Sequence, residues 1–123
     1  MQVKFGAGEN WHESVIYTVD QGWGGLENLS LIPGQVGTAP VQNIGAYGSE
    51  TKDSLISVEA VNINSRVKKV FTNKMCEFDY RDSIFKSQEK GQWVITDVTF
   101  ELAKEPTLKL DYGAIKDLSL IHI

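Results

Sequence analysis

The chain has 123 residues, of which 41% are hydrophobic and 23% are charged, and its formal net charge is −4. This composition is typical of one globular domain with its own core and excludes a disordered chain. The negative charge argues against a nucleic-acid partner, because neutralising phosphates requires a basic surface.

The sequence also predicts the cellular environment. No apolar run approaches the ~20 residues that cross a bilayer, and no signal peptide opens the chain, so no membrane partner is expected. A single cysteine, Cys76, excludes an internal disulfide and a thiolate metal cluster. We therefore expect a cytoplasmic protein in which Cys76 is a small buried apolar side chain.

The N-terminal part predicts a short strand followed by a helix. Val3 and Phe5 alternate with polar neighbours and lead into a turn at residues 6–8. Apolar residues then recur at helical spacing between residues 9 and 21, and Gly22 stands where a helix-ending glycine is expected. The residues with this spacing are Trp11, Val15, Ile16 and Val19.

Residues 24–48 contain six glycines and two prolines, yet they are too apolar for a linker. Glycine permits left-handed backbone and the close approach of another group to the main chain. Thr38, Gln42 and Asn43 can form hydrogen bonds with the edge of a heteroaromatic ring or with a diphosphate. An irregular coil would explain the prolines but not the glycines. We therefore predict a ligand-binding loop, with one helical turn near residues 26–29.

The second half of the chain predicts a sheet. Residues 55–63 and 67–71 are expected to form a β-hairpin, followed by a short helix at residues 74–77. The clearest strand is predicted at residues 93–102. Its expected apolar face consists of Val94, Thr96, Val98, Phe100 and Leu102. The predicted fold class is α+β, with a mostly antiparallel sheet and flanking helices.

Two short motifs near the N-terminus give weak signals. Gly6-Ala7-Gly8 precedes a helix but lacks the third glycine of G-x-G-x-x-G and the Lys-Ser/Thr of a P-loop. His12-Glu13 begins like H-E-x-x-H, but no second histidine follows at the required position. No metal site is predicted.

Tyr80-Arg81-Asp82 offers two interpretations. An arginine next to a carboxylate commonly forms a structural ion pair at the surface. Alternatively, Asp82 holds Arg81 rigid so that its planar fork is directed at an anionic substrate group.

Several segments, in order along the chain, resemble the UDP-N-acetylenolpyruvoylglucosamine reductases (MurB), flavoenzymes of peptidoglycan precursor synthesis. The matching segments are residues 6–12, 25–29, 32–34, 40–48 and 80–86. The resemblance implies that residues 1–117 form the second FAD-binding subdomain of a PCMH or vanillyl-alcohol-oxidase-type fold. It also implies FAD as cofactor, NADPH as reductant and a UDP-sugar enolpyruvyl ether as substrate.

In that family a first FAD subdomain and a substrate domain flank this region. The resemblance thus implies an internal fragment that is inactive without the remainder of its own chain. The last six residues, 118–123, resemble the translation of a sequencing-library adaptor and are expected not to be native. Two other interpretations stay open, namely another flavin oxidoreductase of the same fold and a non-catalytic FAD-binding module.

The resemblance also assigns roles to individual positions. Arg81 matches the family's catalytic arginine, and Tyr47, Arg81 and Tyr112 are expected to contact the substrate. The residues expected to line FAD are Gly34, Gly37, Thr38, Ala39, Val41, Gln42, Asn43, Gly45 and Ile95.

Overall fold

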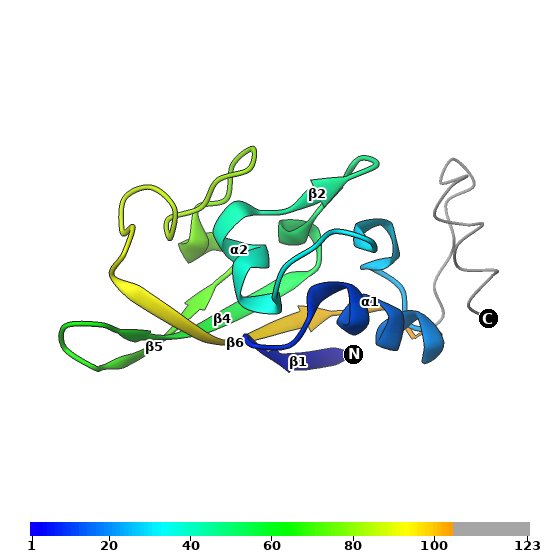
Figure 1. The fold of residues 1–123 in the computed structure, drawn as a ribbon, viewed down its shortest axis with the longest axis horizontal. Helices are drawn as coiled ribbons and strands as arrows, with labels where there is room; N and C mark the ends of the chain where they lie inside the picture. Colours follow the sequence, from blue (N-terminus) through cyan, green and yellow to red (C-terminus); the bar gives the residue numbers. More distant parts are fainter. Residues whose placement is uncertain (105–123) are drawn as a thin grey trace.

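The computed structural model describes residues 1–104. At its base lies a four-stranded antiparallel sheet in the order β1-β6-β4-β5 (Figure 1). Its strands are β1 (Gln2–Gly6), β4 (Leu55–Asn62), β5 (Lys68–Thr72) and β6 (Trp93–Glu101). β4 and β5 form the predicted hairpin, and β6 is the strand predicted at residues 93–102. The predicted α+β fold with a mostly antiparallel sheet is confirmed.

The helices and a second, two-stranded sheet cover one side of the large sheet (Figure 1). They are α1 (Trp11–Asp20), α2 (Ala39–Gln42), β2 (Gly45–Ala46) and β3 (Ser49–Glu50). Within residues 1–104, four short 3₁₀ turns lie at Glu27–Leu29, Val36–Thr38, Thr51–Asp53 and Lys74–Cys76. The hydrophobic core lies beneath this cover, and its largest fully buried side chains include Trp11, Phe71 and Phe100. Burying such aromatic side chains is the main force that holds the cover on the sheet.

Helix α1 begins and ends at recognisable signals. The Asn10 side chain caps its first turn by accepting a 2.9 Å hydrogen bond from the Glu13 amide. At its end, Gly22 has a φ of +79°, which glycine adopts without strain. The Trp11 indole donates a 2.8 Å hydrogen bond to the Leu29 carbonyl, which anchors the following segment on the helix.

A β-bulge in β6 overturns the predicted face of that strand. Asp97 pairs with Glu59, but the next partner, Ala60, pairs with Ile95, so that Thr96 is an extra residue. Because one extra residue reverses the alternation, Val94 and Thr96 do not share a face with the buried Val98 and Phe100. Ile95 and Trp93 turn toward the core side instead.

The glycine-rich segment is more regular than the predicted loop. The predicted turn near residues 26–29 is present, but α2 and the β2–β3 hairpin were not expected from the sequence. Tyr47 and Gly48 form the tip of that hairpin with φ values of +52° and +78°. Two successive left-handed residues fit the twist of a tight hairpin.

Within residues 1–104, no helix is long and apolar enough to cross a membrane.

Candidate functional site: a glycine pocket beside an arginine site

An open pocket of about 310 Å³ lies between the turn after β1, the glycine-rich segment and β6. We call it the glycine pocket. Its lining residues are Ala7, Gly8, Gln35, Gly37, Thr38, Val41, Trp93 and Ile95. Four of the residues expected to line FAD therefore gather in one place, although Ile95 lies more than fifty positions from the others.

Close backbone packing forms one wall of the glycine pocket. The Gly37 amide donates a 2.9 Å hydrogen bond to the Ala7 carbonyl, and the Val36 amide donates a 2.8 Å bond to Glu9. A Cβ atom on Gly37 would lie 2.8 Å from the Ala7 Cβ, which is closer than non-bonded carbons approach. Gly37 is therefore required by this packing.

The other walls combine apolar and polar surface. Val41, Trp93 and Ile95 are partly buried apolar side chains that pack against the core. Thr38 is exposed, and its hydroxyl donates a 2.7 Å hydrogen bond to the Gln35 carbonyl. An apolar floor with a small polar rim suits a planar heteroaromatic group, and no charged side chain lines this pocket.

The remaining expected cofactor residues lie around the pocket rather than on its lining. Gly34 precedes it with a φ of +123°, Ala39 is buried, and Gln42 is exposed on α2. Asn43 and Gly45 continue from α2 toward a second site.

Asn43 is fully buried, and its side chain is engaged inside the protein. Its amide donates hydrogen bonds to the Glu50 carboxylate at 2.9 Å and to the Asp79 carbonyl at 3.0 Å. Its carbonyl accepts a 3.0 Å hydrogen bond from the Lys52 amide. Both of its N–H donors are thus used, and Asn43 links the end of α2 to the second site.

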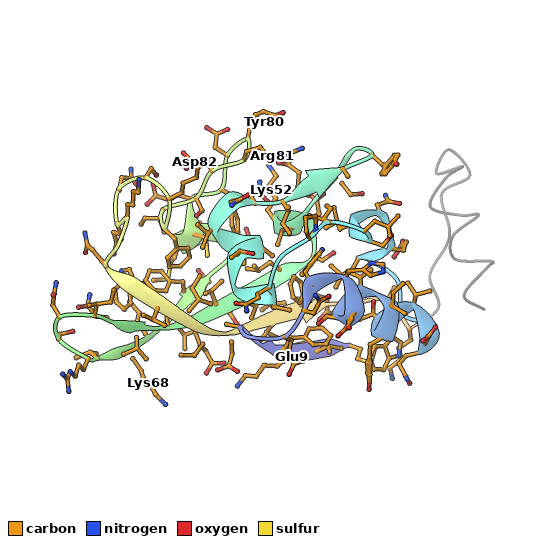
Figure 2. The ribbon with its side chains drawn as sticks, viewed as in Figure 1. Glu9, Lys52, Lys68, Tyr80, Arg81 and Asp82 are labelled. Atoms are coloured by element: carbon orange, nitrogen blue, oxygen red, sulfur yellow. The ribbon has the colours of Figure 1, made fainter. Side chains whose placement is uncertain are left out.

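That second site, which we call the arginine site, is a hollow of about 230 Å³ lined by Ala46, Gly48, Ser49, Glu50, Tyr80 and Arg81. Tyr80, Arg81 and Asp82 lie together on the loop farthest from the large sheet, whereas Lys68 lies on the opposite side (Figure 2). Arg81 has a φ of +49°, and its side chain is 39% exposed.

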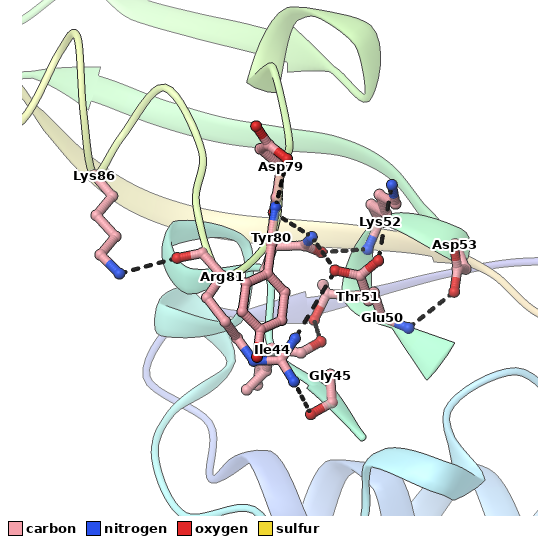
Figure 3. Close-up of polar contacts among 11 residues, drawn as sticks. Ile44, Gly45, Glu50, Thr51, Lys52, Asp53, Asp79, Tyr80, Arg81 and Lys86 are labelled. Atoms are coloured by element: carbon pink, nitrogen blue, oxygen red, sulfur yellow. Dashed lines mark hydrogen bonds and ion pairs between the residues drawn. The ribbon is translucent and has the colours of Figure 1, made fainter. Parts of the chain in front are cut away.

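The Arg81 guanidinium is held by the β2–β3 hairpin (Figure 3). Its Nη2 donates a 3.0 Å hydrogen bond to the Gly45 carbonyl, and its Nη1 lies 3.9 Å from Glu50 Oε2. It also stacks over the Tyr80 ring, with its Cζ 4.7 Å from the ring centroid.

The prediction that Asp82 holds Arg81 is wrong. Among the residues that the structure describes, the Asp82 side chain forms no hydrogen bond or ion pair, and its backbone pairs with Asp79. Glu50 is the carboxylate beside the guanidinium. Arg81 and Asp82 lie in a tight turn, where the side chains of adjacent residues point in different directions. They therefore form no ion pair although they are neighbours in the sequence.

Gly45 and Tyr47 lie on the β2–β3 hairpin, next to the arginine site rather than in the glycine pocket. A Cβ on Gly45 would lie 2.7 Å from Arg81 Nη1 and 2.8 Å from the Ser49 carbonyl oxygen. Only glycine leaves room for the guanidinium at this position. Tyr47 is exposed at the hairpin tip.

Tyr112 and the proposed tail at residues 118–123 lie outside the described residues, as do residues 105–117 of the predicted subdomain.

Two features that the sequence singled out serve the fold. Burial raises the pKa of the Cys76 thiol to about 12, so the side chain is neutral and unreactive at ordinary pH. His12 Nδ1 accepts a 2.8 Å hydrogen bond from the Leu31 amide. Residues 1–104 contain no group of three His, Cys, Asp or Glu side chains that could hold a metal ion.

Comparison with known proteins places this geometry in a family. Residues 1–70, which include β1, α1, the glycine-rich segment and the hairpin, match the FAD binding domain family. The chain belongs to the FAD binding domain family.

Individual relatives carry a more specific name than the family. The chain is 53% identical over 113 residues to the UDP-N-acetylenolpyruvoylglucosamine reductase of Amoebophilus asiaticus, covering 92% of this chain and 33% of that protein. It is 54% identical over 110 residues to the reductase of the same name from Flavobacterium johnsoniae, covering 89% and 33% respectively. The chain spans about a third of the length of these relatives.

The fold is also similar to a solved structure. The crystal structure of UDP-N-acetylenolpyruvylglucosamine reductase (MurB) from Thermus caldophilus matches with a TM-score of 0.75 and 27% identity. The match covers 98% of this chain and 41% of that one.

Sequence reasoning did not predict some of the lining residues. In the glycine pocket these include Ala7, Gln35 and Trp93, and in the arginine site they include Glu50. Trp93 could have been found, because it lies two positions from Ile95 on the same strand. Glu50 carried no such signal, because only folding brings it next to Arg81.

Proposed function

We propose that the chain is the second FAD-binding subdomain of a UDP-N-acetylenolpyruvoylglucosamine reductase, which reduces a UDP-sugar enolpyruvyl ether with electrons from NADPH. The observation that carries this proposal is the position of Arg81. Its guanidinium stands in a hollow that Asn43 connects directly to the end of the segment lining the glycine pocket. Arg81 thus bonds to Gly45, which follows Val41 of the glycine pocket by four residues, so the proposed anion-binding group and the proposed flavin-binding surface lie at the two ends of one short segment.

The glycine pocket fits one part of FAD. Val41, Trp93 and Ile95 offer apolar contact to a flat ring, and the exposed Thr38 hydroxyl oxygen and Gln35 side chain can form hydrogen bonds. Its volume of about 310 Å³ is at the lower end for ligand pockets, so other parts of the reductase complete the site. When bound, FAD supplies the hydride chemistry, taking electrons from NADPH and passing them to the enolpyruvyl double bond.

Arg81 binds the substrate carboxylate and stabilises charge. One of its five N–H donors is occupied by Gly45, and the others make no hydrogen bond to the described residues. Negative charge that develops beside the carboxylate during reduction spreads into it as an enolate. A guanidinium already held in place stabilises this charge more in the transition state than in the ground state.

Completion of the reaction requires a proton donor to the substrate carbon. No residue of this chain matches that role, so we expect the 123-residue chain alone to reduce no substrate.

The test uses a chimera in which the matching segment of the Flavobacterium johnsoniae reductase is replaced by the residues of this chain. Stopped-flow absorbance follows flavin reduction by NADPH and flavin reoxidation by the substrate separately. We expect Arg81→Ala to slow reoxidation by about 100- to 1,000-fold, as removal of one preorganised donor does. Reduction by NADPH should keep its rate.

Arg81→Lys is the matched variant, because it keeps the charge but loses the planar fork. We expect it to restore only part of the rate. Equal losses in both half-reactions would contradict the assigned role, and a chimera that binds FAD but does not reduce the substrate would favour a binding module.

A further inference from the structure

The Glu50 carboxylate is the meeting point of three segments (Figure 3). It accepts a 2.9 Å hydrogen bond from Asn43 and caps the 3₁₀ turn that follows it, within a capping box shared with Asp53. Lys52 Nζ lies 3.7 Å from one of its oxygens, and Arg81 Nη1 lies 3.9 Å from the other. The carboxylate is therefore fixed on three sides before Arg81 is considered.

Asn43 ties this carboxylate to the loop that carries Arg81. The same amide nitrogen donates to Glu50 and to the carbonyl of Asp79, two residues before Arg81. Asn43 is fully buried, so breaking either bond leaves an unpaired polar group in the interior. The hairpin and the 79–82 loop are consequently held at one fixed separation.

The distance between Glu50 and Arg81 is itself informative. At 3.9 Å it is an ion pair but is too long for a hydrogen bond, whose N···O distance is about 2.7–3.2 Å. Glu50 attracts the guanidinium without occupying its N–H donors. A carboxylate that formed a bidentate bond would instead compete with an anionic ligand.

We propose that Glu50 is a positioning residue for Arg81, which directs the guanidinium into the arginine site and leaves its donors available to a carboxylate ligand. The kinetic consequence rests on the proposed function, whereas the orientation of Arg81 can be measured without it. Asp82, the sequence neighbour of Arg81, has no part in this arrangement.

The first experiment measures Arg81 directly by ¹⁵N NMR of the 123-residue chain. The chain has two arginines, and Arg66 serves as an internal reference, because its side chain makes no hydrogen bond or ion pair to the described residues. In the wild type we expect hindered rotation of the Arg81 guanidinium and free rotation of Arg66. Glu50→Gln should give Arg81 the free rotation of Arg66.

Asp82→Asn is the matched control, since it removes the charge that adjoins Arg81 in the sequence, and the Asp82 carboxylate forms no ion pair with Arg81. It should leave Arg81 hindered. Hindered rotation that persists in Glu50→Gln, or that is lost equally in Asp82→Asn, overturns the proposal. If Glu50→Gln does not fold, Glu50→Asp withdraws the carboxylate by one methylene and should also loosen Arg81, and no change there would overturn the proposal.

The second experiment measures the chimera. Glu50→Gln should slow flavin reoxidation by up to roughly fivefold, the limit for a partly exposed ion pair. Substrate affinity should hold or rise, because the site loses a negative charge. A weaker affinity together with a lower rate would indicate structural damage and overturn the positioning role. An unsubstituted chimera that cannot reduce the substrate would refute the proposed function, and the NMR result would still decide the role of Glu50.

Discussion

The glycine pocket and the arginine site lie at the two ends of one short segment, yet they are held by different forces. No charged side chain lines the glycine pocket, and its shape depends on backbone contact between Gly37 and Ala7 and on apolar side chains from β6. The arginine site depends on charges and hydrogen bonds between the hairpin and a loop 36 residues away from Gly45. Salt screens exposed charges but has little effect on packing, so ionic strength should weaken the arginine site selectively.

The largest effect on the pocket side is expected from Gly37→Ala. The new Cβ would lie 2.8 Å from the Ala7 Cβ and 3.2 Å from its carbonyl oxygen, so the wall of the pocket must move. Overpacking of this kind costs about 1–3 kcal/mol, which corresponds to roughly a 5- to 150-fold loss of FAD affinity if the bound state bears the cost. Quenching of flavin fluorescence in the chimera measures this affinity.

Gly8→Ala is the control for the pocket, because Gly8 lines it but its Cβ would meet no atom within 4 Å. A loss of FAD affinity as large as that of Gly37→Ala would show that backbone packing does not define the pocket.

Gly45→Ala should affect the arginine site more than the pocket. Its Cβ would lie 2.7 Å from Arg81 Nη1 and 2.8 Å from the Ser49 carbonyl oxygen, so both the guanidinium and the β2–β3 hairpin must shift. We expect flavin reoxidation by the substrate to slow by about tenfold, less than the loss on removing the donor altogether. FAD affinity should stay within about twofold, because Gly45 does not line the glycine pocket. A twofold change corresponds to well below 1 kcal/mol. The outcome that would contradict this separation is a loss of FAD affinity with an unchanged rate.

The last effect concerns the pH dependence of stability and the buried Cys76 thiol. The folded protein keeps the Cys76 thiol protonated up to about pH 12, whereas the unfolded chain releases this proton near pH 8.5. The unfolded state therefore binds fewer protons in this range, and the free energy of unfolding falls as pH rises between these values. Denaturant unfolding measures the free energy of unfolding at pH 8 and at pH 10. The decrease between these two pH values should be smaller in Cys76→Ala than in the wild type. Equal slopes in both proteins would mean that the thiol is not shielded from water.

The sequence predicted those elements whose signals are local. The α1 helix carries its own cap at Asn10 and its own stop at Gly22, and the β4–β5 hairpin has two alternating strands around a short turn. Gly37, Thr38 and Val41 lie close together in the sequence, so their common wall could be anticipated.

The sequence did not predict features that depend on distant partners. The partner of Arg81 was expected to be its neighbour Asp82, but the positive φ of Arg81 and the β2–β3 hairpin bring Glu50 to it instead. The sequence predicted that side chains alternate without interruption along β6, including Thr96. The bulge at Thr96 could not be predicted from the spacing of apolar residues. Both differences arise where backbone geometry, rather than residue type, sets the direction of a side chain.

The bulge at Thr96 has a consequence for comparing sequences of this kind. The extra residue shifts the alternation of side chains by one position. Odd-numbered residues therefore face the core side before the bulge, and even-numbered residues face it after the bulge. Inserting or removing one residue between Ile95 and Val98 would move the side chains of Trp93 and Ile95 from the side that lines the glycine pocket to the solvent side. The exact number of residues in this strand therefore shapes the glycine pocket as much as the glycines opposite it do.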